Sequence, residues 1–235
     1  MLLCVDNVHA HYGKSHILQG VTFSIGEGEI ISLVGRNGSG RSTTLKAMVG
    51  LLKPTSGSVR LDERQLAGLR LFEIVRHGLA YVPEERLVFA NLTVEENLRM
   101  GEQKAADGVK RWSIEEMYAW FPRLAERRRI AAGSLSGGEQ QMLTICRSLL
   151  GNPRVILIDE PTEGLAPRVM ETVMEAILAI HKAGVSVLLV EQKLTIALKV
   201  SRRVLVMGHG RIVFEGSPQE LMKRDDVRHD WLEVG

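Results

Sequence analysis

Residues 30–52 join an apolar run, a glycine-rich turn and a helical pattern, and this order restricts the fold more than any other stretch. Ile30–Val34 reads IISLV, which is typical of a strand buried on both faces. The turn GRNGSGRS follows it, and Thr43–Leu52 then carries apolar residues at helical spacing. This order matches the phosphate-loop pattern G-x-x-x-x-G-K-[ST], except that Arg41 stands where the lysine belongs.

Two further apolar runs extend the same architecture. Val155–Ile158 and Val185–Val190 read as strands covered on both faces, and Val169–Lys182 fits the crossover helix between them. The sequence therefore predicts an α/β fold with a mainly parallel sheet. At 235 residues the chain is long enough for one large domain, and we treat 1–235 as a single unit.

The pattern becomes helical in the middle of the chain. Thr93–Glu96 and Ser113–Glu116 match the S/T-x-x-E capping box, so each is expected to open a helix, with a polar connection over Glu102–Arg111. We expect a helical subdomain over 85–150, inserted between core segments 1–84 and 151–235. Near the end, 204–207 and 211–214 suggest a hairpin, and Ser217–Glu220 is another capping box that opens a terminal helix.

The glycine turn has the chemistry of an anion site. Gly35, Gly38 and Gly40 allow successive backbone N–H groups to point inward at phosphate oxygens, and the helix that follows adds its positive end. The Ser42 hydroxyl can ligate Mg²⁺. The residues that we expect to bind ATP in this loop are Gly35, Arg36, Asn37, Gly38, Ser39, Gly40, Arg41, Ser42 and Thr43.

Two carboxylates end the apolar run VILIDE. Asp159 and Glu160 fall at the carboxyl end of a strand, which faces the crevice where α/β sheets bind ligands. Asp159 is expected to hold Mg²⁺, partly through water. Glu160 is expected to orient or deprotonate the water that attacks the γ-phosphate.

A third motif stands between the other two. Leu135–Gln140 reads LSGGEQ, in which Ser136 and Glu139 are spaced as a capping box at an open helix N-terminus. With the loop and the Asp-Glu pair, it closely resembles the signature of the ABC-type ATPases, and the resemblance covers essentially the whole chain. It implies an ATPase with an N-terminal antiparallel β portion, whose cofactors are ATP and Mg²⁺. It also implies a head-to-tail dimer in which one domain's signature, Leu135, Ser136, Gly137, Gly138 and Glu139, closes on the other's ATP.

The resemblance assigns further positions. Tyr12 matches the aromatic residue that stacks on adenine, and Glu84 falls where most relatives have a glutamine that senses Mg²⁺ and contacts the transmembrane partner. Gln192 falls where most relatives have a histidine that touches the γ-phosphate, so the resemblance implies a catalytic role for it beside Glu160. Ala166 lacks the aspartate that communicates across the dimer. The stretches VPEERLVFANLTVEENL, SLSGGEQQML, DEPTEGLAP and LLVEQ are similar to the second ATP-binding subunit of branched-chain amino acid importers.

That subgroup implies import of branched-chain amino acids or a related small solute, with urea and short amides as neighbouring possibilities. Its partners would be a second ATPase subunit, two permeases and, indirectly, a periplasmic binding protein, at the cytoplasmic face of the membrane. We keep a regulatory, catalytically weakened half of a heterodimer as the alternative, because of Arg41, Gln192 and Ala166. We disfavour a soluble ABC ATPase of DNA repair or translation, which carries extensions absent here, and exclude a small P-loop kinase on LSGGEQ.

The remaining features of the sequence indicate no further function. The net charge of +2 does not favour nucleic acid as a partner, and no apolar segment approaches the roughly 20 residues that span a bilayer. We expect no signal peptide, and reduced thiols at Cys4 and Cys146. His9 and His11 share a strand face but have no third ligand nearby in sequence, and Asp225–Asp230 is expected to be a solvated end.

Overall fold

The computed structural model describes residues 1–103 and 112–232, and within these ranges its larger sheet has six strands. The order is β10-β9-β3-β8-β7-β6, parallel except for the β9–β10 hairpin. The bounds are β3 Ile30–Val34, β6 Leu79–Val82, β7 Val155–Asp159, β8 Ser186–Glu191, β9 Arg203–Gly208 and β10 Arg211–Gly216. The expected α/β fold with a mainly parallel sheet is confirmed.

A second, antiparallel sheet packs beside the first. Its described strands follow the order β2-β1-β4-β5, with bounds β1 Leu3–Tyr12, β2 Ser15–Ile25, β4 Ser56–Leu61 and β5 Arg64–Gln65. Helix α1 (Arg41–Met48) lies between the two sheets, because Leu45 and Met48 join one apolar core with residues of both. The expected N-terminal antiparallel portion is therefore present.

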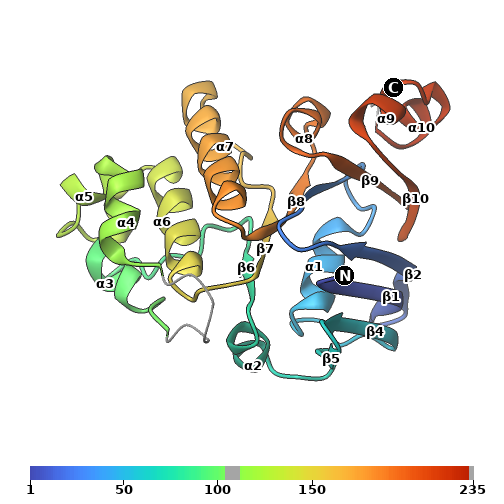
Figure 1. Ribbon diagram of the computed structural model, residues 1–235, viewed down its shortest axis with the longest axis horizontal. Helices are drawn as coiled ribbons and strands as arrows, with labels where there is room; N and C mark the ends of the chain where they lie inside the picture. The colour runs from blue at the N-terminus through green and yellow to red at the C-terminus, as the bar shows by residue number, and fades with distance from the viewer. Residues whose placement is uncertain (104–111, 233–235) are drawn as a thin grey trace.

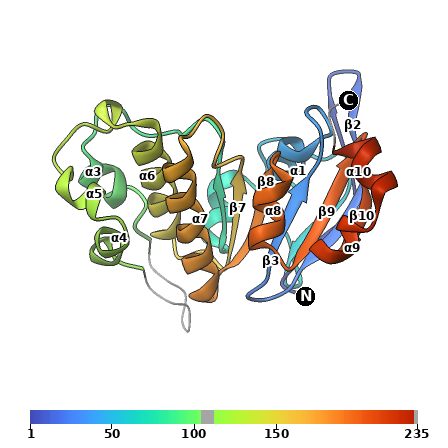
Figure 2. The same cartoon turned by 90° about the horizontal axis from the view of Figure 1, so that it is seen from above.

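The remaining helices separate into two groups. Figure 2 shows α3, α4, α5 and α6 at one end of the molecule, while α9 and α10 lie beside the sheet at the other end. Their bounds, with those of the helices between them, are α2 Leu71–Arg76, α3 Val94–Arg99, α4 Ile114–Trp120, α5 Pro122–Glu126, α6 Gly137–Leu149, α7 Pro167–Lys182, α8 Leu194–Val200, α9 Pro218–Met222 and α10 Asp225–Trp231, and a 3₁₀ turn spans Ala132–Ser134.

Strand β7 shows why the sheet is buried on both faces (Figure 1). Ile156 and Ile158 enter the core shared with α6 and α7, whereas Val155 and Leu157 enter the core shared with α1. Alternation along an extended chain sends successive side chains to opposite faces, so a strand with helices on both sides is apolar throughout. This strand carries Asp159 and then Glu160 to the edge of the sheet where β3 also ends.

The helix starts predicted from capping boxes are confirmed. The side chains of Thr93, Ser113, Ser136 and Ser217 each accept a hydrogen bond from the backbone N–H three residues on. The terminal helix expected after Ser217 is present as α9, which ends at Met222, and a second helix, α10, starts at Asp225. Most of the expected connection Glu102–Arg111 falls outside the described residues. No helix in the described ranges is long and apolar enough to cross a membrane.

Candidate functional site

The N-terminus of α1 differs from the capped helices in having no side chain over its first amides. Its N-cap is Gly40, with φ of 111°, and no side chain accepts a hydrogen bond there. That left-handed conformation favours glycine, and a Cβ on Gly40 would lie 3.1 Å from both Leu18 Cδ2 and Met207 Cε. The loop therefore leaves the first N–H groups of α1 available to an anion, as a phosphate site requires.

Strand order brings the two other predicted elements to this loop. Strands β3, β8 and β7 are parallel neighbours, so their carboxyl ends meet at one edge. The Ser42 hydroxyl donates to Asp159 Oδ1 at 3.0 Å, which joins the loop to the end of β7. A cavity of about 330 Å³ opens here, lined by Asn37, Gly38, Ser39, Gly40, Arg41, Ser42, Thr43, Glu84, Glu160, Glu163 and Gln192.

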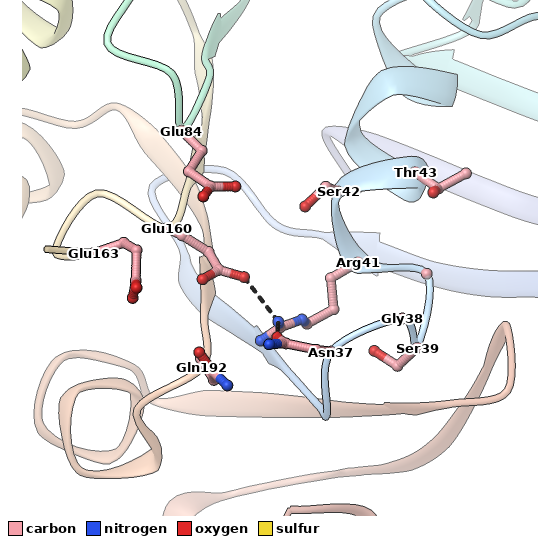
Figure 3. A pocket seen from close by; sticks show the side chains of 11 residues that line it. Asn37, Gly38, Ser39, Arg41, Ser42, Thr43, Glu84, Glu160, Glu163 and Gln192 are labelled. Atoms are coloured by element: carbon pink, nitrogen blue, oxygen red, sulfur yellow. Dashed lines mark hydrogen bonds and ion pairs between the residues drawn. The ribbon is translucent and has the colours of Figure 1, made fainter.

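Arg41 is buried at the centre of this arrangement, with 4% of its side chain exposed. Its Nη2 donates to Glu160 Oε1 at 2.7 Å and to Asn37 Oδ1 at 3.2 Å, and its Nη1 donates to the carbonyl of Glu191 at 3.0 Å. Figure 3 shows the guanidinium reaching from the loop to Glu160 across the cavity. The expected positive charge is thus present, and it forms an ion pair with the predicted catalytic carboxylate.

Burial raises the pKa of the carboxyl groups around Arg41. The pKa of Asp159 rises to about 6, against the lowering effect of hydrogen bonds from Ser42 and Tyr81. Burial also raises the pKa of Glu160, although the Arg41 charge opposes it. Burial likewise raises the pKa of Glu191 to about 7 despite a hydrogen bond from Thr162. Such raised pKa values are expected where a site excludes water and concentrates negative charge.

Of the other predicted residues, two line this cavity and the rest lie outside its lining. Glu84 and Gln192 line the cavity with the loop. Tyr12 ends β1 on the antiparallel sheet, with its side chain 47% exposed and outside the cavity lining. The LSGGEQ segment opens α6, where Ser136, Gly138 and Glu139 line a separate cavity with Trp120 and Phe121. None of the described signature residues therefore lines the cavity at the phosphate loop of the same chain.

Three contributors were not predicted. The Tyr81 hydroxyl donates to Asp159 Oδ2 at 3.3 Å, Thr162 donates to the buried Glu191 at 2.9 Å, and Glu163 lines the cavity. Their only signal in the sequence is position, since each lies within a few residues of a predicted site residue at the end of a strand. Only the sheet order shows that these positions converge.

The side chains present fit ATP and Mg²⁺. Ser39 Oγ is buried in the loop with no hydrogen-bond partner among the described residues, as expected of a hydroxyl that serves a bound oxygen. Ser42 and Asp159 present a hydroxyl and a carboxylate 3.0 Å apart, and oxygen ligands of this kind suit Mg²⁺. The uncapped N-terminus of α1 supplies backbone donors for phosphate.

The fold places a further imidazole, that of His16, beside His9 and His11. His16 faces them from β2, with His9 Nδ1 3.0 Å from His16 Nε2 and the His11 and His16 rings stacked at 4.1 Å. Within residues 1–103 and 112–232, however, no group of three His, Cys, Asp or Glu side chains is arranged to hold a metal ion. The charged residues Asp225, Asp226, His229 and Asp230 are exposed as expected, but the segment is helical within α10 and buries Val227.

Comparison with known proteins finds a matching family model and relatives that are ATP-binding proteins of transport systems. The ABC transporter family model matches residues 18–163. The chain is 41% identical, over 98% of its length and 99% of the relative's, to the high-affinity branched-chain amino acid transport ATP-binding protein BraG of Pseudomonas aeruginosa. It is 31% identical, over 98% and 96%, to the lipopolysaccharide export ATP-binding protein LptB of Acidithiobacillus ferridurans. A solved structure, the dimeric post-hydrolysis state of the ATP-binding cassette MJ0796 with ADP and Pi, superposes with a TM-score of 0.77 at 27% identity, covering 92% of this chain and 99% of that one.

Proposed function

The chain belongs to the ABC transporter family of ATP-binding subunits, and on that premise we propose that it hydrolyses ATP to power import of branched-chain amino acids or a related small solute. The convergence of the phosphate loop, Asp159 and Glu160 on one cavity carries the ATPase part of this proposal. The solute rests on the 41% identity to a branched-chain amino acid transport subunit. The lipopolysaccharide export relative, at 31% identity, makes an exporter the main competing reading.

The proposed chemistry divides among the residues of the cavity. The backbone of Gly38–Thr43 and the N-terminus of α1 would bind the β- and γ-phosphates, and Arg41 would contribute positive charge. Ser42 and Asp159 would hold Mg²⁺, which when bound neutralises phosphate charge. Glu160, a carboxylate of raised pKa, would orient a water and accept its proton, with Gln192 and Glu84 flanking the γ-phosphate.

The position of the signature supports a dimer. Ser136 and the N-terminus of α6 lie outside the lining of the phosphate cavity of the same chain, which supports a role toward a nucleotide held by another subunit. Tyr12 would cover the adenine from the antiparallel sheet, which its exposure permits. A head-to-tail pair, with itself or a sister subunit, would complete two sites. The solved structure of the relative MJ0796 with ADP and Pi is itself dimeric, which supports a pair of subunits here.

An exposed apolar groove supports permease partners. Leu71, Phe72, Phe89 and Met100 are between 37% and 63% exposed and line a cavity of about 1090 Å³. Arginines flank it, with the Arg147 guanidinium carbon 4.9 Å from the centre of the Phe89 ring. A contiguous apolar patch with a polar rim is typical of a protein interface, so we propose that permeases dock here. The subunit would then sit peripherally at the cytoplasmic face of the membrane, with a periplasmic solute-binding protein as an indirect partner.

A regulatory, catalytically weakened half of a heterodimer remains the second candidate. The observation that favours it is the ion pair between Arg41 and Glu160, which occupies the carboxylate that would activate water. The two candidates differ in turnover, since the first hydrolyses ATP through Glu160 and the second does not.

The solute is tested by uptake in cells. A strain that lacks this gene receives wild type, Glu160→Gln or, as a matched control, Glu175→Gln, which changes an exposed carboxylate on α7. We expect wild type and Glu175→Gln to restore uptake of radiolabelled leucine, and Glu160→Gln to fail. Leucine uptake that does not depend on the gene would refute the proposed solute, and parallel assays with urea and with a short amide would identify a neighbouring one.

A further inference from the structure

The guanidinium of Arg41 joins three segments of the site. Its two Nη atoms contact the loop itself at Asn37, the end of β7 at Glu160 and the end of β8 at Glu191. Strands β7 and β8 pair at Asp159 and Val190, so Glu160 and Glu191, which follow these two residues, are neighbours at the ends of the two strands. The fork of an arginine presents two separate nitrogens to such a pair of acceptors, whereas a lysine presents one.

The Arg41–Glu160 pair is shielded from water. The two side chains are 4% and 11% exposed, and the 2.7 Å contact is a short charge-assisted hydrogen bond. Shielded pairs of this kind are stronger than exposed ones, and breaking one leaves an unpaired charge. Arg41 therefore holds the Glu160 carboxylate in place through its Oε1 atom.

A γ-phosphate on the loop and the Glu160 carboxylate compete for this guanidinium. Of the side chains that line the described cavity, three are carboxylates, those of Glu84, Glu160 and Glu163, and Arg41 is the one cation. A bound phosphate would draw Arg41 toward itself because it carries more negative charge than one carboxylate. The same movement would release Glu160 to accept a hydrogen bond from water.

We propose that Arg41 is a positioning residue that restrains the catalytic carboxylate Glu160, and that γ-phosphate binding releases it. This inference rests on the proposed ATPase function and adds a step to it. Arginine in place of lysine then has a specific effect: part of the binding free energy of ATP is used to break the Arg41–Glu160 pair. The chain gains a means of keeping Glu160 inactive until ATP is on the loop.

A double-mutant cycle on the full chain tests the restraint. Isothermal titration with Mg-AMPPNP gives affinities for wild type, Arg41→Lys, Glu160→Gln and the double variant. We expect Arg41→Lys to bind roughly tenfold more tightly when Glu160 is present, a change of about 1.4 kcal/mol. In the Glu160→Gln background the same substitution should change affinity less than about twofold, because a neutral amide holds the guanidinium only weakly. Arg41→Lys should also raise kcat for Mg-ATP.

The possible outcomes separate the two proposals. An equal effect of Arg41→Lys in both backgrounds, or weaker binding when Glu160 is present, overturns the restraint and leaves Arg41 as a phosphate ligand only. No binding of Mg-AMPPNP by any variant, wild type included, overturns the ATPase proposal as well. Arg203→Lys is the matched control, since Arg203 pairs with Glu29 away from the cavity, and it should leave affinity unchanged.

If Arg41→Lys does not fold, Asn37→Ser supplies a second test. It removes one acceptor of the guanidinium and leaves both members of the ion pair. We expect it to ease the movement of the guanidinium toward the γ-phosphate, with a roughly two- to threefold gain in Mg-AMPPNP affinity, since it removes one ordinary hydrogen bond that holds Arg41 in place. Unchanged or weaker binding by a folded Asn37→Ser protein would contradict the restraint.

Discussion

Glu191 should make the protein less stable as the pH rises through neutrality, and Glu191→Gln should remove this effect. The carboxyl is 2% exposed and accepts a hydrogen bond from Thr162 at 2.9 Å. Burial raises its pKa from 4.5 to about 7. Between these values the folded protein keeps the proton and the unfolded chain loses it, so stability falls as the pH rises across this window. At pH 8 the effect reaches about 3 kcal/mol, since one pKa unit corresponds to roughly 1.4 kcal/mol.

The substitution suits the site because an amide stays neutral and keeps an oxygen for the Thr162 hydroxyl. Urea unfolding at pH 5 and at pH 8 gives the free energy of unfolding of both proteins. We expect Glu191→Gln to exceed wild type by about 3 kcal/mol at pH 8 and by under about 1 kcal/mol at pH 5. Glu175→Gln, on the exposed face of α7, should change stability by less than about 0.5 kcal/mol at either pH. A difference between wild type and Glu191→Gln that does not vary with pH would refute the reasoning.

Three further outcomes can be measured. Gly40→Ala should abolish Mg-ATP binding and lower the free energy of unfolding by about 2 kcal/mol, because a residue with a Cβ is strained at the Gly40 φ of 111°. Gly28→Ala is the control and should bind Mg-ATP normally, since Gly28 has a φ of 60° and open space for a Cβ. Asn97→Ala should lower the free energy of unfolding by about 3 kcal/mol in urea, since this buried amide bonds the backbone of Phe89, Leu92 and Thr93. EDTA should stop phosphate release and added Mg²⁺ should restore it; release that continues in EDTA would contradict the role of Ser42 and Asp159.

Much of the fold could be predicted because its signals are local. The runs IISLV and VILI become β3 and β7 since a strand covered on both faces must be apolar throughout. The capping boxes at Thr93, Ser113 and Ser136 locate helix starts because both hydrogen bonds form within four residues. The end of a helix carries no such signal at α9, which stops at Met222 after the box at Ser217.

The contacts within the site could not be predicted, because they depend on strand order and register. Arg41 and Glu160 are 119 residues apart in the sequence. They meet because β3, which leads into the loop of Arg41, and β7, which ends just before Glu160, have only β8 between them in the sheet. His16 faces His11 through the register of β1 and β2, which bulges shift at several positions. The residue types indicated phosphate chemistry at the loop, but the sequence held no information on which acceptors the arginine would reach.

The central claim is that this chain hydrolyses ATP with Glu160 as its catalytic carboxylate, despite Arg41 in the phosphate loop. The most direct measurement is phosphate release by the purified chain with saturating Mg-ATP, for wild type and Glu160→Gln, with Glu175→Gln as the matched control. We predict wild type and Glu175→Gln to turn over alike, and Glu160→Gln to fall at least roughly a hundredfold, as expected when a general base is removed. Wild-type release no faster than that of Glu160→Gln, from a chain that sizing shows to be dimeric with Mg-ATP, would contradict the claim and favour the regulatory half of a heterodimer.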